Sequence, residues 1–206
     1  MIGGKGMNYF LSAILGYFVG NFSSSFLAGK LTKNIDIRQY GSGNAGATNT
    51  FRVLGSKIGF IVFIGDVLKG VIAALIGYWI AGESGAIISS LAAIIGHNWP
   101  VFLQFRGGKG IATSLGSLIV IIPLVSAVVF VIGIVIIVVT KYVSLASIIA
   151  AVLLPILTVV FKCSKGEIIY AIIVSVLALY RHKSNIKRLL SGTENKIDFS
   201  PKQKAK

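Results

Sequence analysis

Acidic residues are scarce in this chain: Asp and Glu number 6 among 206 residues, against 20 Lys and Arg. Charged residues make up only 13% of the chain, whereas soluble domains carry about 25%. Hydrophobic residues make up 55% and the mean hydropathy is +0.86, so the composition indicates an integral membrane protein. Six carboxylates leave few ligands for a divalent metal, and the single cysteine, Cys163, excludes a disulfide scaffold. We expect neither a metal nor a cofactor.

Several catalytic signatures are also missing. Neither histidine is followed by Asp five residues later, since Phe102 follows His97 and Lys187 follows His182. There is no G-x-S-x-G nucleophile elbow and no Walker P-loop. These absences exclude the His–Asp acyltransferase dyad, a serine nucleophile on a G-x-S-x-G elbow and a Walker-type nucleotide site. The net charge of +14 would suggest nucleic acid binding in a soluble protein. In a membrane protein, the distribution of basic residues first indicates which side of the chain faces the cytoplasm.

Long apolar runs predict the membrane spans, because a crossing helix needs about 20 mainly apolar residues. The expected helices cover residues 8–29, 58–82, 86–104, 111–122, 124–140, 144–161 and 167–180. A cleaved signal peptide is an alternative for the first run, which is long for one and has a weakly basic start. The stretch 111–140 contains Pro123 and could form one kinked helix or a hairpin of two helices.

Charge placement decides between these possibilities. With a hairpin at Pro123 there are seven spans, and 16 of the 20 basic residues lie on one side. With a single kinked helix, the basic C-terminal segment faces away from the loop at 30–57. The positive-inside rule therefore favours seven spans, an outside N-terminus and a cytoplasmic C-terminus. We predict one all-α membrane domain over residues 1–206, with short re-entrant or interfacial segments and a disordered tail at 198–206.

The first of three polar segments is Gly41–Thr50, which is followed by Phe51 and Arg52. Its glycines permit close approach of backbone N–H groups to an anion, and arginine can pair with phosphate through two N–H groups. A flexible loop would also be glycine-rich, but it would not need Asn44, Thr48 and Arg52 so close together. We therefore predict a phosphate-binding loop.

The second polar segment, residues 105–110, places three glycines around Lys109 just before an expected helix. A helix N-terminus offers free N–H groups and positive dipole to an anion, and Lys109 adds a full charge. A membrane-surface anchor is the alternative, but an anchor does not need the glycines. Phosphate is again the favoured ligand.

The third polar segment, residues 181–194, predicts a short amphipathic interfacial helix that ends at Gly192. A basic helix lying on anionic lipid would explain this segment alone. However, His182, Asn185 and Arg188 are one turn apart and share a face. That face could close over a bound anion.

Three further polar residues lie within predicted spans. Asp66 and Lys69 are three positions apart, and intramembrane charges are costly, so they should pair with each other or face the site. A structural pair is at least as plausible as a catalytic one. His97 lies in Gly96-His97-Asn98-Trp99-Pro100 and could be an inert core histidine or a site residue.

The three polar segments resemble those of a known family, the bacterial acyl-phosphate:glycerol-3-phosphate acyltransferases (PlsY type). GSGNAGATNTFRVLG is similar to the first motif of the family, FRGGKGIATSLG to the second and HKSNIKRLLSGTE to the third. GDVLKG, GHNWPVF and YVSLAS are similar to its intervening blocks. The resemblance covers residues 10–197.

The resemblance implies a seven-helix enzyme of the bacterial cytoplasmic membrane, with its site facing the cytoplasm. It would transfer a fatty acyl group from acyl phosphate to the sn-1 hydroxyl of glycerol 3-phosphate, the first acylation of phosphatidic acid synthesis. Membrane lipids would surround it, and a soluble enzyme that makes acyl phosphate is a candidate partner for the basic face. No nucleic acid partner is expected.

The matched motifs, together with the polar residues of the spans and of the third segment, give the expected site. The expected catalytic residues are Ser42, Lys109, His97 and His182, the histidines as alternatives to the donor's own phosphate for accepting the hydroxyl proton. The expected substrate-binding residues are Gly43, Asn44, Thr48, Arg52, Gly107, Gly108, Gly110, Ser144, Asn185 and Arg188. The expected structural residues are Asp66, Lys69 and Glu194.

Two other functions remain possible from the residues. A transporter or flippase for an anionic metabolite or lipid phosphate would also need glycines, broken helices and basic residues. The location of all three basic motifs on one side argues against alternating access. A scaffold on anionic lipid would explain the charge but not the glycine–asparagine loop.

Overall fold

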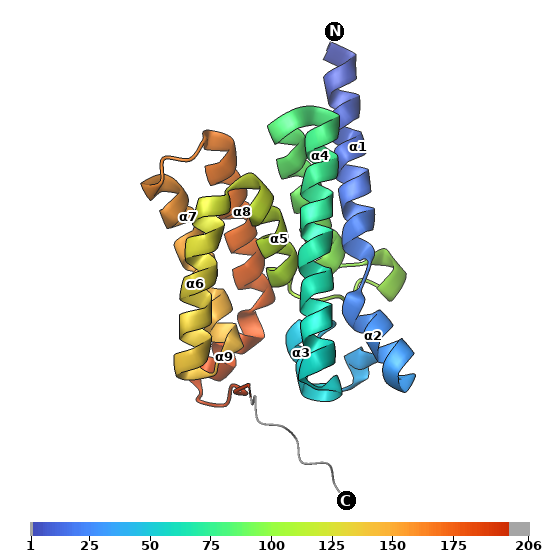
Figure 1. The fold of residues 1–206 in the computed structure, drawn as a ribbon, viewed down its shortest axis with the longest axis vertical. Helices are drawn as coiled ribbons and strands as arrows, with labels where there is room; N and C mark the ends of the chain where they lie inside the picture. The colour runs from blue at the N-terminus through green and yellow to red at the C-terminus, as the bar shows by residue number, and fades with distance from the viewer. Residues whose placement is uncertain (1, 198–206) are drawn as a thin grey trace, which may run out of the picture.

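Helices make up the architecture, and the breaks between them position the functional residues (Figure 1). The structure, a computed structural model, describes residues 2–197, among which there is no β-strand. The predicted disordered tail at 198–206 lies outside these residues. The α-helices are α1 (Ile2–Asn21), α2 (Ser24–Lys33), α3 (Ala47–Leu54), α4 (Ser56–Asn98), α5 (Ile111–Ile121), α6 (Pro123–Thr140), α7 (Val143–Val160), α8 (Lys165–Arg181) and α9 (Lys183–Leu190). Two 3-10 helices cover Ile37–Gln39 and Val101–Leu103.

The long helix α4 is a hairpin of two arms. The backbone leaves the helical conformation at Ala81 and Gly82, and Gly82 has a φ of 62° that favours glycine. Across the hairpin, Ser89 Oγ donates to the carbonyl oxygen of Ala73 at 2.6 Å. The two arms correspond to the separate helices predicted over 58–82 and 86–104. The second arm ends at Asn98, earlier than predicted, because Pro100 follows within two residues and disfavours helix in the residue before it.

The first apolar run is not one helix, contrary to the prediction for residues 8–29. α1 ends at Asn21, and the Ser23 side chain caps a new helix, α2, by accepting the N–H of Phe26 at 3.3 Å. Lys69 from α4 donates to the carbonyl oxygen of Phe22 at 2.7 Å. A backbone carbonyl that a helix break leaves free at such a position needs a partner, and Lys69 supplies it.

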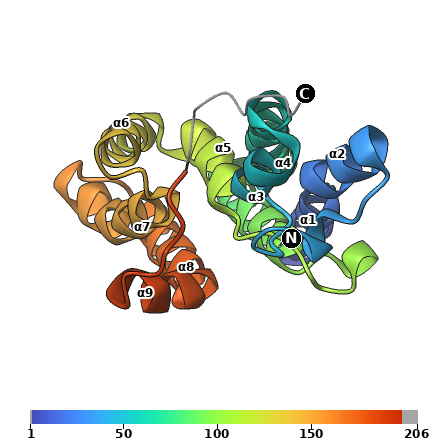
Figure 2. The same ribbon diagram turned by 90° about the horizontal axis from the view of Figure 1, so that it is seen from below.

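The stretch 111–140 is broken at Pro123, as the hairpin prediction requires. α5 ends at Ile121, Ile122 is non-helical, and Pro123 is the first residue of α6, a position that does not need its N–H. In Figure 2, α5 lies between the group formed by α1 to α4 and the group formed by α6 to α9. α5 therefore brings the start of its helix to the centre of the molecule.

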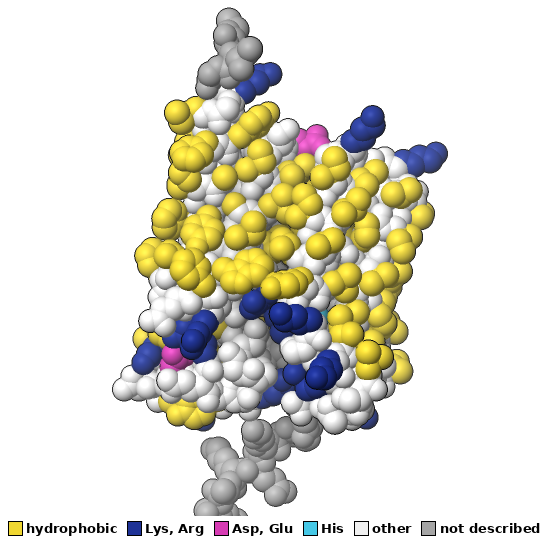
Figure 3. Space-filling model, turned by 180° about the vertical axis from the view of Figure 1, so that it is seen from behind, with side chains coloured by type: hydrophobic (Ala, Val, Ile, Leu, Met, Phe, Trp, Pro, Cys, Tyr) yellow, Lys and Arg dark blue, Asp and Glu magenta, His cyan; other side chains and the backbone are white. Residues whose placement is uncertain are grey.

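The outer surface suits a bilayer. Four helical segments among residues 2–197 are long and apolar enough to cross a membrane. These are Gly4–Lys33, Ser56–Leu103, Pro123–Thr140 and Val143–Val160, and the second of them contains both arms of α4. In Figure 3 hydrophobic side chains form a broad band, and most Lys and Arg side chains lie below it, toward the end where Figure 1 places α2, α3 and α9.

Candidate functional site

The three polar segments converge on one cavity of about 260 Å³. Its polar part is lined by residues from the segment before α3, from α3, from the start of α5, from α7 and from α9. The predicted residues that line it are Ser42, Asn44, Thr48, Arg52, His97, Lys109, Gly110, Ser144, His182, Asn185 and Arg188, together with Asp66 and Glu194. The structure therefore brings together residues that lie up to 152 positions apart in the sequence.

Asn49 shapes the first polar segment. Its side chain is buried, its Oδ1 accepts the N–H of Ser42 at 2.8 Å, and its Nδ2 donates to the carbonyls of Ile37 and Tyr40 at 3.2 and 3.0 Å. Asn49 thus holds the loop folded so that Ser42 can face the cavity. Gly43 serves the turn: it has a φ of 71°, and its N–H donates to the carbonyl of Tyr40 at 3.1 Å. This N–H is therefore engaged within the loop, and substrate binding by Gly43, which lines a second cavity described below, stays a prediction.

The glycines of the second segment allow close packing. A Cβ on Gly107 would lie 2.0 Å from the carbonyl oxygen of His97, and a Cβ on Gly108 would lie 2.0 Å from His97 Nε2. The N–H groups of Gly107 and Gly108 donate to the carbonyls of Asn98 and His97 at 3.3 and 3.0 Å. We expected these two N–H groups to bind substrate, but they hold the loop against the end of α4. The free helix N-terminus is two residues after Gly108, at Gly110, which has no side-chain cap.

A chain of hydrogen bonds joins the second and third segments to α7. Lys109 Nζ donates to Asn185 Oδ1, and Asn185 Nδ2 donates to Glu194 Oε1 at 2.8 Å. Ser144 Oγ donates to the same carboxylate oxygen at 2.9 Å, and Arg188 Nε donates to Glu194 Oε2 at 2.7 Å. Glu194 is the hub of this network, and it orients the residues that face the cavity.

Charge and burial shift the pKa values of the polar residues. Burial lowers the pKa of Lys109 to about 8, with the charges of Arg188, Arg52 and Arg181 acting in the same direction and that of Glu194 opposing them. Burial likewise lowers the pKa of Arg52. Burial alone would raise the pKa of Glu194, but hydrogen bonds from Asn185 and Arg188 outweigh it and the pKa falls. The network thus contains a carboxylate and several cations at neutral pH.

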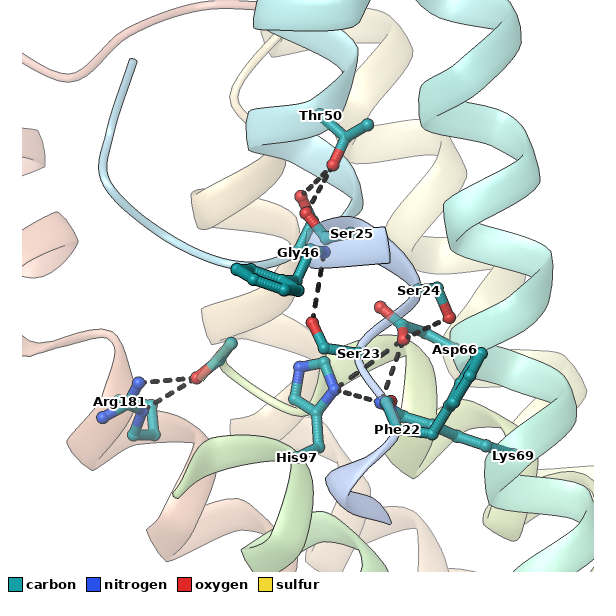
Figure 4. A network of polar contacts seen from close by, with 12 residues as sticks. Phe22, Ser23, Ser24, Ser25, Gly46, Thr50, Asp66, Lys69, His97 and Arg181 are labelled. Atoms are coloured by element: carbon teal, nitrogen blue, oxygen red, sulfur yellow. Dashed lines mark hydrogen bonds and ion pairs between the residues drawn. The ribbon is translucent and has the colours of Figure 1, made fainter. Parts of the chain in front are cut away.

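The two histidines occupy different surroundings. His182 is buried at the end of α8, and its Nδ1 lies 2.8 Å from the carbonyl oxygen of Ala178. Because a carbonyl can only accept, Nδ1 carries the proton and Nε2 has the lone pair. Burial lowers the pKa of His182 to about 4, so the ring is neutral at pH 7. His97 instead contacts Lys69 within the buried group that Figure 4 shows, and Lys69 pairs with Asp66 at 3.0 Å.

The cavity continues from its polar part into an apolar limb. This limb runs between α5, α6, α7 and α8, and it includes Gly133, at which an added Cβ would meet no atom within 4 Å. The apolar residues that line it include Leu118, Val129, Phe130, Ile134, Ile137, Leu154 and Val174. An anion with a hydrocarbon tail would match both parts of this cavity.

Sequence reasoning missed the role of Arg181. Its Nε and Nη2 donate to the carbonyl oxygen of Gly108 at 3.1 and 2.6 Å, and its guanidinium lies 5.2 Å from the ring of Trp99. Arg181 therefore fixes the loop that carries Lys109. The sequence signal that could have identified Arg181 was its position directly before His182 in the third segment.

A second, polar cavity of about 780 Å³ adjoins the first and shares Ser42, Asn44, Lys109 and Arg188 with it.

Comparison with known proteins gives a consistent result. Residues 10–192 match the model of the family described as "Glycerol-3-phosphate acyltransferase". A glycerol-3-phosphate acyltransferase of Thermoanaerobacter sp. (strain X514) is 52% identical over 187 residues, which cover 91% of this chain and 94% of the relative. One of Fusobacterium nucleatum is 47% identical over 200 residues, covering 94% of this chain and 100% of the relative.

Two solved structures are also similar. Both are crystal structures of PlsY (YgiH), described as an integral membrane glycerol 3-phosphate acyltransferase, and both are 38% identical to this chain. The glycerol 3-phosphate form has a TM-score of 0.87 and covers 92% of this chain and 96% of that one. The lysophosphatidic acid form has a TM-score of 0.85, with 93% and 96% covered.

Proposed function

The chain belongs to the glycerol-3-phosphate acyltransferase family, and we propose that it transfers a fatty acyl group from acyl phosphate to the sn-1 hydroxyl of glycerol 3-phosphate. The products are 1-acyl-glycerol 3-phosphate and phosphate. The observation that carries this proposal is the single cavity that joins a cationic part to an apolar limb. Its cationic part suits two phosphate groups, and its limb suits the acyl chain that one substrate brings.

The proposed reaction depends more on the correct positioning of the two substrates than on a strong base. The sn-1 hydroxyl oxygen attacks the carbonyl carbon, and the bond from that carbon to the phosphate oxygen breaks. Acyl phosphate is a mixed anhydride with a good leaving group, so two aligned substrates and a stabilised oxyanion supply most of the rate. Arg52, Lys109 and Arg188 would hold the phosphates, with Asn44, Thr48 and the start of α5 at Gly110 as further ligands.

The hydroxyl proton has two acceptors in this proposal, the phosphate that leaves and His182. Because Nδ1 of His182 donates to Ala178, the lone pair on Nε2 is the atom that could receive a proton. The low pKa of His182 makes it a weak base, which favours the phosphate as the final acceptor. Ser42, whose backbone is held by Asn49, would hydrogen-bond the substrate next to the reacting hydroxyl.

We further propose seven crossings with the N-terminus outside and the site facing the cytoplasm of a bacterial cell. The seven segments are α1 with α2, the two arms of α4, α5, α6, α7 and α8. The gathering of basic side chains at one end supports this orientation through the positive-inside rule (Figure 3). The same end carries α3 and α9 (Figure 1), which hold two of the proposed phosphate ligands, Arg52 and Arg188.

The adjoining polar cavity would receive glycerol 3-phosphate from the cytoplasm. Its lining includes Arg38, Arg106, Arg181 and Lys183, with Asp36 as the carboxylate that pairs with Arg38 at 2.7 Å. A cationic approach of this kind raises the local concentration of an anionic substrate. The same basic face would suit a soluble enzyme that delivers acyl phosphate.

The choice of donor provides the test. Purified protein in detergent is mixed with labelled glycerol 3-phosphate and either palmitoyl phosphate or palmitoyl-CoA, and lysophosphatidate is measured. We expect product from acyl phosphate and none above background from the thioester. Equal turnover of the thioester would overturn the donor assignment. Turnover in detergent also excludes a pure transport function, because no membrane separates two compartments.

A further inference from the structure

A buried charged group lies beside the phosphate-binding residues and has no part in the reaction proposed above. Lys69 on the first arm of α4 contacts Asp66 on the same arm and His97 on the second arm (Figure 4). Ser24, the first residue of α2, donates to Asp66 Oδ1 at 3.1 Å. The side chains of Asp66, Lys69 and His97 are at most 5% exposed. Such a group is costly to bury, which calls for a reason.

The hydrogen bonds of Lys69 determine which nitrogen of His97 carries the proton. Lys69 Nζ lies 3.0 Å from Asp66 Oδ1, 2.7 Å from the carbonyl oxygen of Phe22 and 2.7 Å from His97 Nδ1. An ammonium group has three N–H donors and no acceptor, and the Asp66 carboxylate stabilises that charged form. Two of the donors go to oxygens that can only accept. The third is left for His97 Nδ1, so Nδ1 presents its lone pair and the ring proton is on Nε2.

The other side of the His97 ring faces the site. A Cβ on Gly108 would lie 2.0 Å from His97 Nε2, so the ring rests directly against the loop that carries Lys109. His97 also lines the cavity, and of its two ring nitrogens Nδ1 is the one that Lys69 engages. His182 has the opposite arrangement, with its proton on Nδ1. The two histidines thus present a donor and an acceptor to the same cavity.

We propose that Lys69 and Asp66 hold His97 as a neutral imidazole whose Nε2–H donates a hydrogen bond to an oxygen of the bound phosphate-bearing substrate. His97 would then be a catalytic donor, in place of the proton acceptor expected from the sequence. Lys69 and Asp66 are positioning residues that act through it. The identity of the substrate rests on the proposed function, but the tautomer does not.

Nitrogen NMR of the histidine-labelled protein in detergent micelles tests the tautomer directly, because the chain has only 2 histidines. His182→Gln assigns the two sets of signals. At pH 7 we expect a pyridine-like Nδ1 and a pyrrole-like Nε2 for His97 in the otherwise unmodified chain. A proton on Nδ1, or on both nitrogens, would overturn the proposal. Adding glycerol 3-phosphate should shift the Nε2 signal of His97, and an unchanged signal at saturation would remove the donor role.

Matched substitutions test the same point by activity. The amide of His97→Gln can place an N–H near the position of Nε2, whereas that of His97→Asn places it near Nδ1. We expect His97→Gln to retain at least tenfold more kcat/KM than His97→Asn, and the reverse order would contradict the donor role. Lys69→Met should change the tautomer signal of His97, and an unchanged signal would remove Lys69 from the account. If the unmodified protein shows the expected tautomer but no acyl transfer, the proposed function fails and the tautomer assignment stands.

Discussion

Deprotonation of Lys109 should make the activity of the enzyme decline above about pH 8. Its buried amine has a pKa of about 8 because burial and three arginines disfavour the charged form. Below that pH the side chain is an ammonium that can bind phosphate, and above it the neutral amine cannot. With this pKa the ammonium fraction is about nine-tenths at pH 7 and about one-tenth at pH 9. Phosphate monoesters have a second pKa of about 6, so the charge of glycerol 3-phosphate changes little over this interval.

We therefore expect kcat/KM to fall close to tenfold between pH 7 and pH 9, since this parameter reports the free enzyme. Bound phosphate stabilises the ammonium form, so the fall in kcat should occur at higher pH. The assay measures lysophosphatidate formation, with acyl phosphate hydrolysis subtracted from enzyme-free samples. Lys109→Arg keeps its charge throughout and should flatten the profile, whereas Lys109→Met should be weak at every pH. A flat profile for the unmodified enzyme, or an equal fall in Lys109→Arg, would refute the reasoning.

Four further results are expected. Arg52→Ala removes a charged phosphate ligand worth about 1.5–3 kcal/mol, so kcat/KM should fall by roughly 10- to 150-fold. The variant should still elute as a folded species from size exclusion, and normal activity would contradict the assignment of Arg52 as a phosphate ligand. Gly108→Ala would drive a methyl group into His97 and should lower the thermal unfolding temperature, with an overpacking cost of about 1–3 kcal/mol. Gly6→Ala is the control, because a Cβ there meets no atom within 4 Å and alanine favours helix, so this substitution should not lower the unfolding temperature. Gly133→Phe should fill the apolar limb and shift the kcat/KM preference from long to short acyl phosphates; an unchanged preference would remove the limb from the acyl site. The KM for glycerol 3-phosphate should rise with ionic strength while kcat changes less, and a salt-independent KM would exclude electrostatic attraction by the basic cavity.

The sequence predicted the features that depend on strong local signals. Proline at 123 broke the apolar stretch where expected, because it lacks an N–H and suits the first position of a helix. The short amphipathic helix of the third segment is present as α9, and Gly192 follows it with a φ of 70°. Asp66 and Lys69 were expected to pair with each other or to face the site, because charges in an apolar helix have few other partners; they pair, and Asp66 also lines the cavity.

Features that depend on contacts between distant segments could not be predicted. The break at Phe22 lies in a short polar interruption, residues 21–25, of an otherwise apolar run, and it is stabilised by Lys69, which is 47 positions away. Gly107 and Gly108 looked like anion ligands because glycine suits both a phosphate loop and close packing. Only the position of His97 distinguishes these two uses. Arg181 was overlooked because its partner is a backbone carbonyl, which has no signature in the sequence.

The most direct test of the account measures phosphate release and lysophosphatidate formation together, from acyl phosphate and glycerol 3-phosphate in detergent. If one cavity binds both substrates and transfers the acyl group directly, the two products should form in equal amounts and only when both substrates are present. The double variant Arg52→Ala, Lys109→Ala should form neither above background. Phosphate release without lysophosphatidate, or normal turnover by the double variant, would contradict the account.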